Sequence, residues 1–324
     1  MSRFYDSDTK AASNPSSSSS SEDEDDVNAR VRPDWEIYRD LLEHRGFHLD
    51  TVRDVKQFYE GYWGDKGTKQ SAGYSRACGL SDDAALCKDP GLHDNLFRGH
   101  QIKDNTRIVV KAVHLHSREL EIIRLLSSPP VRDHPMNHCI PVLDLIEARD
   151  DKIAFIVMEE WSSQLIPETP CCLRLFLIAL RTCIEHITFM HLHRIAHLDI
   201  SLRNLVTDYK GQYACIDFEL SRHFKAVDRP RIRGIRSTEI PPELERGDSS
   251  DPFKVDVWAL AMLIVRACHS TGYVVPELVT LTVPMFNEEH SRRPTALDVL
   301  TGFDSMIRHI GDARLREGAK RTTF

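Results

Sequence analysis

The chain has 324 residues, enough for one large domain or two small ones, and 41% of them are hydrophobic, which allows a sizeable core. Its formal net charge is -7, and much of the acidity comes from one unbroken run at residues 22–26 (EDEDD). The rest of the chain is only mildly acidic, so the overall charge does not indicate nucleic-acid binding and we expect no nucleic-acid partner.

Cysteine usage and apolar runs favour an intracellular protein. The eight cysteines form no Cys-x-x-Cys pair, which favours reduced, structural thiols and argues against a zinc site. The N-terminus lacks the apolar region of a signal peptide. Residues 171–193 are the most apolar stretch, but Arg174, Arg181 and Glu185 interrupt it and favour a buried helix over a membrane span. We therefore expect a cytoplasmic or nuclear location, no membrane partner and a monomer.

The first predicted segment, residues 1–32, is a disordered tail. A serine run followed by an acidic run cannot bury enough apolar area to order itself. Ser20 and Ser21 directly precede the acidic run, as acceptor sites of acid-directed kinases do. The alternative is a solubilising tail with no regulatory role.

Residues 33–94 form the second segment, a helical extension followed by a loop. In the stretch PDWEIYRDLLEHRG, helical spacing places Trp35, Tyr38 and Leu42 on one face, and Gly46 ends the predicted helix. TVRDVKQFYEGYWG repeats this pattern, and residues 64–94 are rich in Gly, Ser and Asp, which is typical of a loop.

Strand patterns dominate the next part of the chain, up to residue 160. Short branched runs predict strands in NLFRGHQI and RIVVKAVHL, and two more around the Arg-Asp-Asp turn of IPVLDLIEARDDKIAFIVME. Between these pairs, SRELEIIRLLSS predicts a helix capped by Ser117. After Trp161 the pattern is mostly helical. The expected fold class is α+β, with a small antiparallel β-sheet lobe followed by a larger, mostly helical lobe.

The polar residues that phosphoryl transfer from ATP requires occur in a consistent order. A cation must hold the triphosphate, oxygen ligands must hold magnesium, and a carboxylate must orient the acceptor hydroxyl. Lys111 lies inside an apolar strand, and Glu119 begins the next helix. Asp199, with Asn204 five residues later, and Asp217 supply carboxylate and amide oxygens.

These motifs resemble the protein kinase fold over residues 95–312, with a small lobe at 95–160, a large lobe at 161–312 and a basic tail at 313–324. The VVK motif is similar to the kinase strand whose lysine grips the nucleotide phosphates, which implies that role for Lys111. Glu119 resembles the helix-C glutamate that pairs with this lysine. FIVMEEW resembles the adenine-binding hinge, with Met158 as gatekeeper. The resemblance implies further adenine-site contacts at Glu159, Trp161 and Val206.

The large-lobe motifs extend the resemblance. HLDISLRN is similar to H-R-D-x-x-x-x-N, which implies that Asp199 is the catalytic carboxylate and Asn204 a magnesium ligand. IDFE resembles D-F-G, which implies that Asp217 is the main magnesium ligand.

Two further motifs belong to the helical lobe. IPPE resembles A-P-E, so Glu243 is expected to pair with Arg293, and DVWALA implies that Asp256 braces the catalytic loop. More narrowly, LLSSPPVRDHPMNHCIPVLDL and the N-terminal helices resemble fungal, mushroom-type kinase-like proteins.

Four departures from the kinase pattern are visible. Only Gly99 remains of the glycine-rich loop, and Leu198 replaces the arginine that receives an activating phosphate. Ser201 stands where a lysine is usual; Arg203 either supplies that charge or is a solvated loop arginine. Glu219 replaces the glycine of D-F-G and either points towards magnesium or away from it.

The favoured reading is an ATP- and magnesium-dependent kinase for Ser/Thr hydroxyls of an unidentified protein substrate. The catalytic set is Lys111, Glu119, Asp199 and Arg203. One alternative is a pseudokinase that keeps the fold as a binding module. The other is a small-molecule phosphotransferase, because choline kinase-like and aminoglycoside kinase-like enzymes share H-x-D-x-x-x-x-N followed by I-D-F-E.

Overall fold

The computed structural model describes residues 27–63, 72–162, 172–208, 210–225 and 228–318. The predictions for Ser20, Ser21 and most of the acidic tail therefore lie outside the described residues, as does Cys171.

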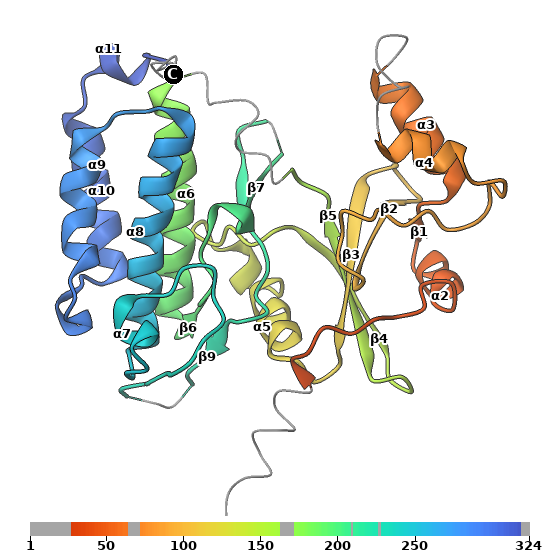
Figure 1. The fold of residues 1–324 in the computed structure, drawn as a ribbon, viewed down its shortest axis with the longest axis horizontal. Coiled ribbons are helices and arrows are strands. Elements are labelled where there is room, and N and C mark those ends of the chain that lie inside the picture. Colours follow the sequence, from red (N-terminus) through yellow and green to blue (C-terminus); the bar gives the residue numbers. More distant parts are fainter. Residues whose placement is uncertain (1–26, 64–71, 163–171, 209, 226–227, 319–324) are drawn as a thin grey trace, which may run out of the picture.

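The small lobe is built on an antiparallel five-stranded sheet with strand order β1-β2-β3-β5-β4 (Figure 1). Its strands are β1 (Phe47–Leu49), β2 (Leu96–Gln101), β3 (Arg107–His114), β4 (Val142–Ala148) and β5 (Ile153–Glu159). The four strands predicted from the sequence are confirmed as β2 to β5.

The first strand was not predicted. β1 lies inside residues 33–94, where the sequence indicated helices and loop, and it pairs with β2. The connection between these two strands contains α3 (Val52–Trp63) and α4 (Ala72–Cys78) rather than a short glycine-rich turn. Gly99 belongs to β2, and a Cβ atom there would lie 2.2 Å from the His48 carbonyl oxygen. Glycine is therefore required at this position for the close approach of β1 and β2.

The outer face of the sheet is covered by the segment around α2 (Arg39–His44). The rings of Trp35 and Tyr38 pack on Phe155 with centroids 5.8 and 4.9 Å apart. Both side chains are buried, as the predicted apolar face required, but residues 35–38 form a turn and the helix begins only at Arg39. Gly46, with φ of +87°, follows the helix end as predicted.

The inner face of the sheet points towards helix α5 (Arg118–Leu126) and the second lobe. Strand periodicity separates the two faces, because alternate side chains point to opposite sides. In β3, Ile108 and Val110 join the outer cluster, whereas Val109 and Lys111 line the cleft between the lobes. The Ser117 hydroxyl accepts a hydrogen bond from the Leu120 N–H, which confirms the predicted cap of α5.

The large lobe is mostly helical and packs around α6 (Leu173–Leu192), which lies between the other helices and the cleft (Figure 1). By length and composition α6 could cross a membrane, but 67% of its apolar window is buried in this lobe, as in the core helix predicted from the sequence. The other helices are α7 (Pro242–Glu245), α8 (Pro252–Thr271), α9 (Pro276–Thr282), α10 (Ala296–His309) and α11 (Asp312–Leu315).

Short strands at the cleft position the remaining polar residues. β7 (Leu205–Thr207) and β8 (Tyr213–Cys215) form a hairpin that directly follows Asn204 and closely precedes Asp217. The Ile216 N–H donates to the Asn204 carbonyl oxygen at 3.0 Å, so the two ends of the hairpin lie side by side. β6 (Ile195–Ala196) pairs with β9 (Arg222–His223) on the other side of this region.

Candidate active site

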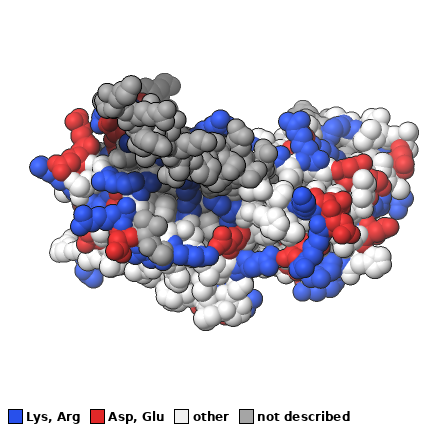
Figure 2. Space-filling view, turned by 90° about the horizontal axis from the view of Figure 1, so that it is seen from below, with Lys and Arg blue, Asp and Glu red and all other residues white. Residues whose placement is uncertain are grey.

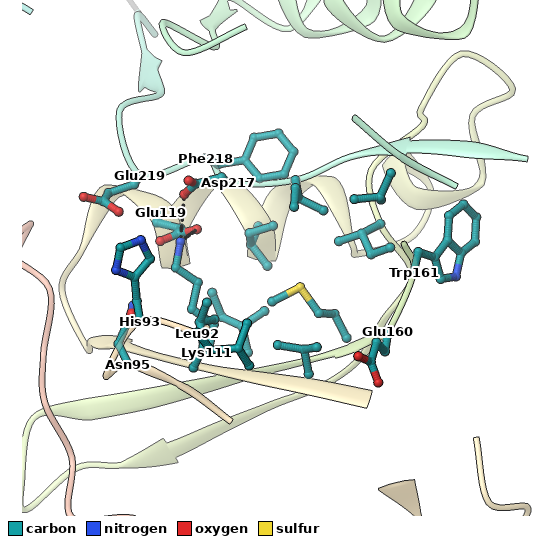
Figure 3. A pocket seen from close by; sticks show the side chains of 18 of the residues that line it. Leu92, His93, Asn95, Lys111, Glu119, Glu160, Trp161, Asp217, Phe218 and Glu219 are labelled. Atoms are coloured by element: carbon teal, nitrogen blue, oxygen red, sulfur yellow. Dashed lines mark hydrogen bonds and ion pairs between the residues drawn. The ribbon is translucent and has the colours of Figure 1, made fainter. Parts of the chain in front are cut away.

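Lys111 is the centre of the site. Its Nζ lies 2.7 Å from Glu119 Oε1 and 2.8 Å from Asp217 Oδ1, so it joins the small lobe to the large one (Figure 3). The lysine and Glu119 are both buried. Burial alone lowers the pKa of Lys111, but the two carboxylates outweigh it and raise the pKa above its ordinary value. Lys111 is therefore held as a cation.

The start of α5 explains how Glu119 reaches Lys111 only eight residues along the chain. The helix begins at Arg118, so Glu119 lies in its first turn and faces β3. Glu121, two residues further along the helix, instead pairs with Lys225 at the surface. Burial raises the pKa of Asp217, but the positive charge and hydrogen bond of Lys111 outweigh this effect and lower the pKa. The Asp217 carboxylate is therefore charged.

An apolar cleft of about 210 Å³ extends from this cluster towards the end of β5. Met158, Glu159, Trp161 and Val206, the residues expected at the adenine site, all line it. Figure 3 shows the charged cluster at one end of the cleft and Trp161 and Glu160 at the other. The cleft thus combines an apolar chamber with a charged end.

The catalytic loop is held by hydrogen bonds around Asp199. Asn204 Nδ2 donates to Asp199 Oδ2 at 3.0 Å and to its carbonyl oxygen at 2.8 Å. The Thr238 N–H donates to Asp199 Oδ1 at 2.7 Å, a contact that no sequence pattern indicated. The buried Asp256 accepts from the N–H groups of His197 and Leu198 at 2.7 and 2.8 Å. This is the brace predicted from DVWALA.

A second ion pair anchors the end of this region. Arg293 donates to both carboxylate oxygens of Glu243, at 2.8 and 2.7 Å, and the side chains are 0% and 4% exposed. The pair joins α7 to the segment before α10, as expected from IPPE and RRPTA.

Glu219 lies at the charged end of the cleft and is paired, with its carboxylate directed away from Lys111 (Figure 3). Its Oε2 accepts a hydrogen bond from Arg30 Nε at 2.9 Å, and Arg30 Nη1 lies 3.2 Å from His93 Nε2. All three residues line the cleft. The sequence patterns did not indicate Arg30 or His93 as site residues, because neither belongs to a recognisable motif.

Arg203 is the predicted site residue that the structure does not bring to the others. It is exposed in the short turn Leu202–Asn204, and neither cavity lined by the other site residues includes it. Its arrangement favours the solvated-loop reading.

No cluster of three or more His, Cys, Asp or Glu side chains suited to a metal ion occurs in the part of the chain that the structure describes. A site made from Asp217 and the amide oxygen of Asn204 would therefore need ligands from outside the protein, such as water and phosphate. Magnesium sites are commonly of this kind.

Comparison with known proteins finds no matching family model, but it does find distant kinases. The chain is 24% identical over 197 residues to the serine/threonine-protein kinase crk1 of Schizosaccharomyces pombe, covering 58% of this chain and 57% of that protein. It is 32% identical over 141 residues to Aurora kinase B of Danio rerio, covering 40% of this chain and 41% of that protein. A serine/threonine-protein kinase of Yarrowia lipolytica is 22% identical over 205 residues, covering 52% of this chain and 28% of that protein.

The matches span only 28% to 57% of the lengths of these relatives. They do not test the narrower resemblance to mushroom-type proteins, which stays a prediction. The two-lobed fold, the buried lysine between two carboxylates and these distant matches together support an assignment at the level of the protein kinase-like superfamily.

Proposed function

We propose that this protein is an ATP- and magnesium-dependent protein kinase that transfers the γ-phosphoryl group to Ser or Thr hydroxyls of a protein. The observation that carries the proposal is Lys111, held as a buried cation between Glu119 and Asp217 at the end of an apolar cleft. Such a cation is positioned to bind phosphate oxygens.

The lining of the cleft suits a nucleoside triphosphate. Its apolar walls, which include Val109, Met158 and Val206, suit a flat base. The backbone N–H of Trp161 has no hydrogen-bond partner within the described residues and is a free donor beside this chamber. Lys111 then binds the phosphates at the charged end.

The residues also fit magnesium. Asn204 Nδ2 is directed at Asp199, which leaves the amide oxygen for a metal, and Asp217 contributes a carboxylate. Magnesium, when bound, neutralises charge on the phosphates. Asp217 also bonds Lys111, so the same carboxylate would set the position of both the metal and the lysine.

Asp199 is the residue proposed to act on the acceptor. Its carboxylate accepts the proton of the incoming hydroxyl as the hydroxyl oxygen bonds to the γ-phosphorus and ADP leaves. The Asn204 amide and the Thr238 N–H fix the orientation of this carboxylate. Asp256 fixes the backbone that carries it.

The phosphate side of the cleft is built without a glycine-rich turn. Leu92, His93 and Asn95, at the end of the long connection from β1 to β2, line the cleft instead. Because side chains such as His93 occupy this wall, we expect weaker ATP binding than a glycine loop gives, since glycine allows the closest approach of backbone N–H groups to phosphate.

The test is incorporation of labelled phosphate from ATP into a mixed pool of proteins, with Asp199→Asn as the inactive control. We expect transfer to serine and threonine that requires magnesium and is absent in the control. If the protein binds nucleotide or a partner but transfers no phosphate, it is a pseudokinase that keeps the fold as a binding module. Transfer to small aminoalcohols but not to proteins would support the small-molecule alternative, in which Glu219, at the wall of the cleft, belongs to the working site.

A further inference from the structure

A second cavity, of about 770 Å³, opens on the acceptor side of the nucleotide cleft. The two cavities share Arg30, Asp217 and Glu219 in their walls, and the second one also contains Asp199. A hydroxyl that reaches Asp199 must therefore belong to a molecule that occupies this second cavity.

The segment along this cavity is strongly basic. Between residues 222 and 236 the only acidic side chain is Asp228, against six basic ones: Arg222, Lys225, Arg229, Arg231, Arg233 and Arg236. Arg222 and Arg236 line the cavity. The side chains of Arg229, Arg233 and Arg236 are exposed and form no ion pair within the part of the chain that the structure describes. Figure 2 shows Lys and Arg on both halves of this face, and on the helical-lobe half some of them lie inside a hollow.

The carboxylates in the same cavity do not cancel this charge, because its wall contains four arginines, Arg30, Arg118, Arg222 and Arg236, against three carboxylates. Asp217 pairs with Lys111, and Glu219 pairs with Arg30. Asp199 accepts hydrogen bonds from the Thr238 N–H and the Asn204 amide. The exposed arginines therefore dominate the potential, and an acidic peptide is the complementary ligand.

The first described residues of the chain lie at this cavity. Asn28 and Arg30 line it, and Asn28 Oδ1 accepts a hydrogen bond from the Arg118 N–H at 2.9 Å. In Figure 1 these first described residues (red) lie below α5, between the lobes. The eleven residues 16–26, SSSSSSEDEDD, immediately precede them and lie outside the described residues. The seven residues from Ser21 to Asn28 can span up to about 24 Å, enough to fold back across the cavity.

We propose that this cavity binds the chain's own residues 16–26, with the acidic run on the arginines and the serine run at Asp199. The transfer step rests on the proposed kinase function. In that step the bond between the β–γ bridging oxygen of ATP and the γ-phosphorus breaks, and a serine Oγ bonds to the phosphorus. The serine proton passes to Asp199, and ADP leaves. The site is thus selective for serines followed by acidic residues, and its first substrate is in cis.

A binding experiment tests the docking without requiring catalysis. Fluorescence anisotropy measures binding of a labelled peptide of residues 16–26 to the full chain, and to a full-chain variant in which residues 22–26 are changed to Gln and Asn. A segment tethered this closely has a millimolar effective concentration, so we expect at least about tenfold tighter peptide binding to the neutral variant. Adding Arg233→Glu and Arg236→Glu should reverse that gain.

The matched control is Arg308→Glu, which changes an exposed arginine on α10, on the far side of α6 from the cleft (Figure 1). It should leave peptide affinity within about twofold of the neutral variant. The docking proposal would be overturned if the peptide bound wild type and the neutral variant with equal affinity. It would also be overturned if Arg308→Glu weakened peptide binding as much as Arg233→Glu and Arg236→Glu together.

A second measurement tests the transfer. With ATP and magnesium, mass spectrometry should find phosphate on the serines of residues 16–21, at a rate independent of protein concentration over a hundredfold range. Expected peptide binding with no phosphate on any protein would leave the docking intact and refute the kinase function. A different result would refute the docking and leave the kinase function intact. In that result other serine substrates are phosphorylated, residues 16–21 stay unmodified, and the peptide binds wild type and the neutral variant equally well.

Discussion

The ion pair between Arg30 and Glu219 leads to an unusually direct test of the cleft's electrostatics. Arg30 Nε donates to Glu219 Oε2 at 2.9 Å beside the proposed phosphate site. Arg30→Ala leaves the carboxylate uncompensated, and we expect it to weaken binding of magnesium-ATP. Glu219→Gly leaves the cation uncompensated, and we expect it to strengthen binding. The double variant restores the wild-type charge and should bind nearly as wild type does.

The size of the effect follows from the chain geometry. Cα atoms two residues apart are separated by at most about 7 Å, so we take the Glu219 carboxylate to lie on the order of 7–10 Å from the phosphate and magnesium site at Asp217. For one unit of charge on Glu219 and one on the bound phosphate, the Coulomb relation then gives about 0.8 kcal/mol at 10 Å with a dielectric constant of 40. At 7 Å with a dielectric constant of 20 it gives about 2.4 kcal/mol. An effect of about 1–2 kcal/mol corresponds to roughly 5- to 30-fold in Kd.

Isothermal titration calorimetry of the four proteins with magnesium-ATP measures this directly. Both shifts should shrink as salt rises from 50 to 500 mM, because the charges are partly exposed. The reasoning is wrong if both single variants shift affinity in the same direction, or if the double variant is not closer to wild type than either.

Glu219→Gly also separates the alternative functions. A kinase of the proposed kind should keep or slightly increase its activity. A choline kinase-like enzyme, in which this carboxylate belongs to the working site, should lose activity with the fold intact by circular dichroism.

Other variants probe the rest of the site. Lys111→Met should remove the rise in melting temperature that magnesium-ATP gives to wild type, measured by differential scanning fluorimetry. Arg293→Met leaves Glu243 buried without its partner and should cost about 3–5 kcal/mol of unfolding free energy, roughly 6–20 °C in Tm. Burial raises the pKa of Glu243, but the hydrogen bonds and charge of Arg293 outweigh it and lower the pKa. The ion pair therefore contributes its full stabilisation above about pH 4.3, the pKa of Glu in the unfolded chain, and this stabilisation is lost as the pH falls through the lower pKa of Glu243 in the folded protein. In urea unfolding at pH 3–5, Glu243→Gln should reduce the dependence of unfolding free energy on pH. Thr238→Ala keeps the N–H that bonds Asp199 and should change kcat less than tenfold, whereas Thr238→Pro removes it and should cost more, about 1.5–3 kcal/mol.

Several features were predictable because they depend on local pattern. Alternation in RIVVKAVH separates the faces of β3, so a lysine among apolar neighbours must point into a cleft or pair with an anion. The cap at Ser117 and the stop at Gly46 follow from the preferences of single residues. The motif order then predicted the cluster around Lys111, which the structure brings together.

The structure differs from the sequence-based predictions where a residue's partners are distant along the chain or belong to no recognisable motif. A strand of three residues, β1, is too short to show a period, so the sheet began later in the prediction than in the molecule. Gly99 was counted as a remnant of a phosphate loop, but it serves the contact between β1 and β2. Arg203, for which supplying catalytic charge was one of two readings, is exposed and lines neither cavity.

The orientation of Glu219 is the clearest case of what only the tertiary structure decided. Its sequence context allowed it to point inwards or outwards. The deciding partner, Arg30, is 189 residues away and lies in a segment predicted from composition alone to be disordered. Composition and periodicity report how a residue relates to its neighbours along the chain. Which charges meet across a cleft is set by how the packed lobes bring distant segments together, and no local pattern encodes that distance.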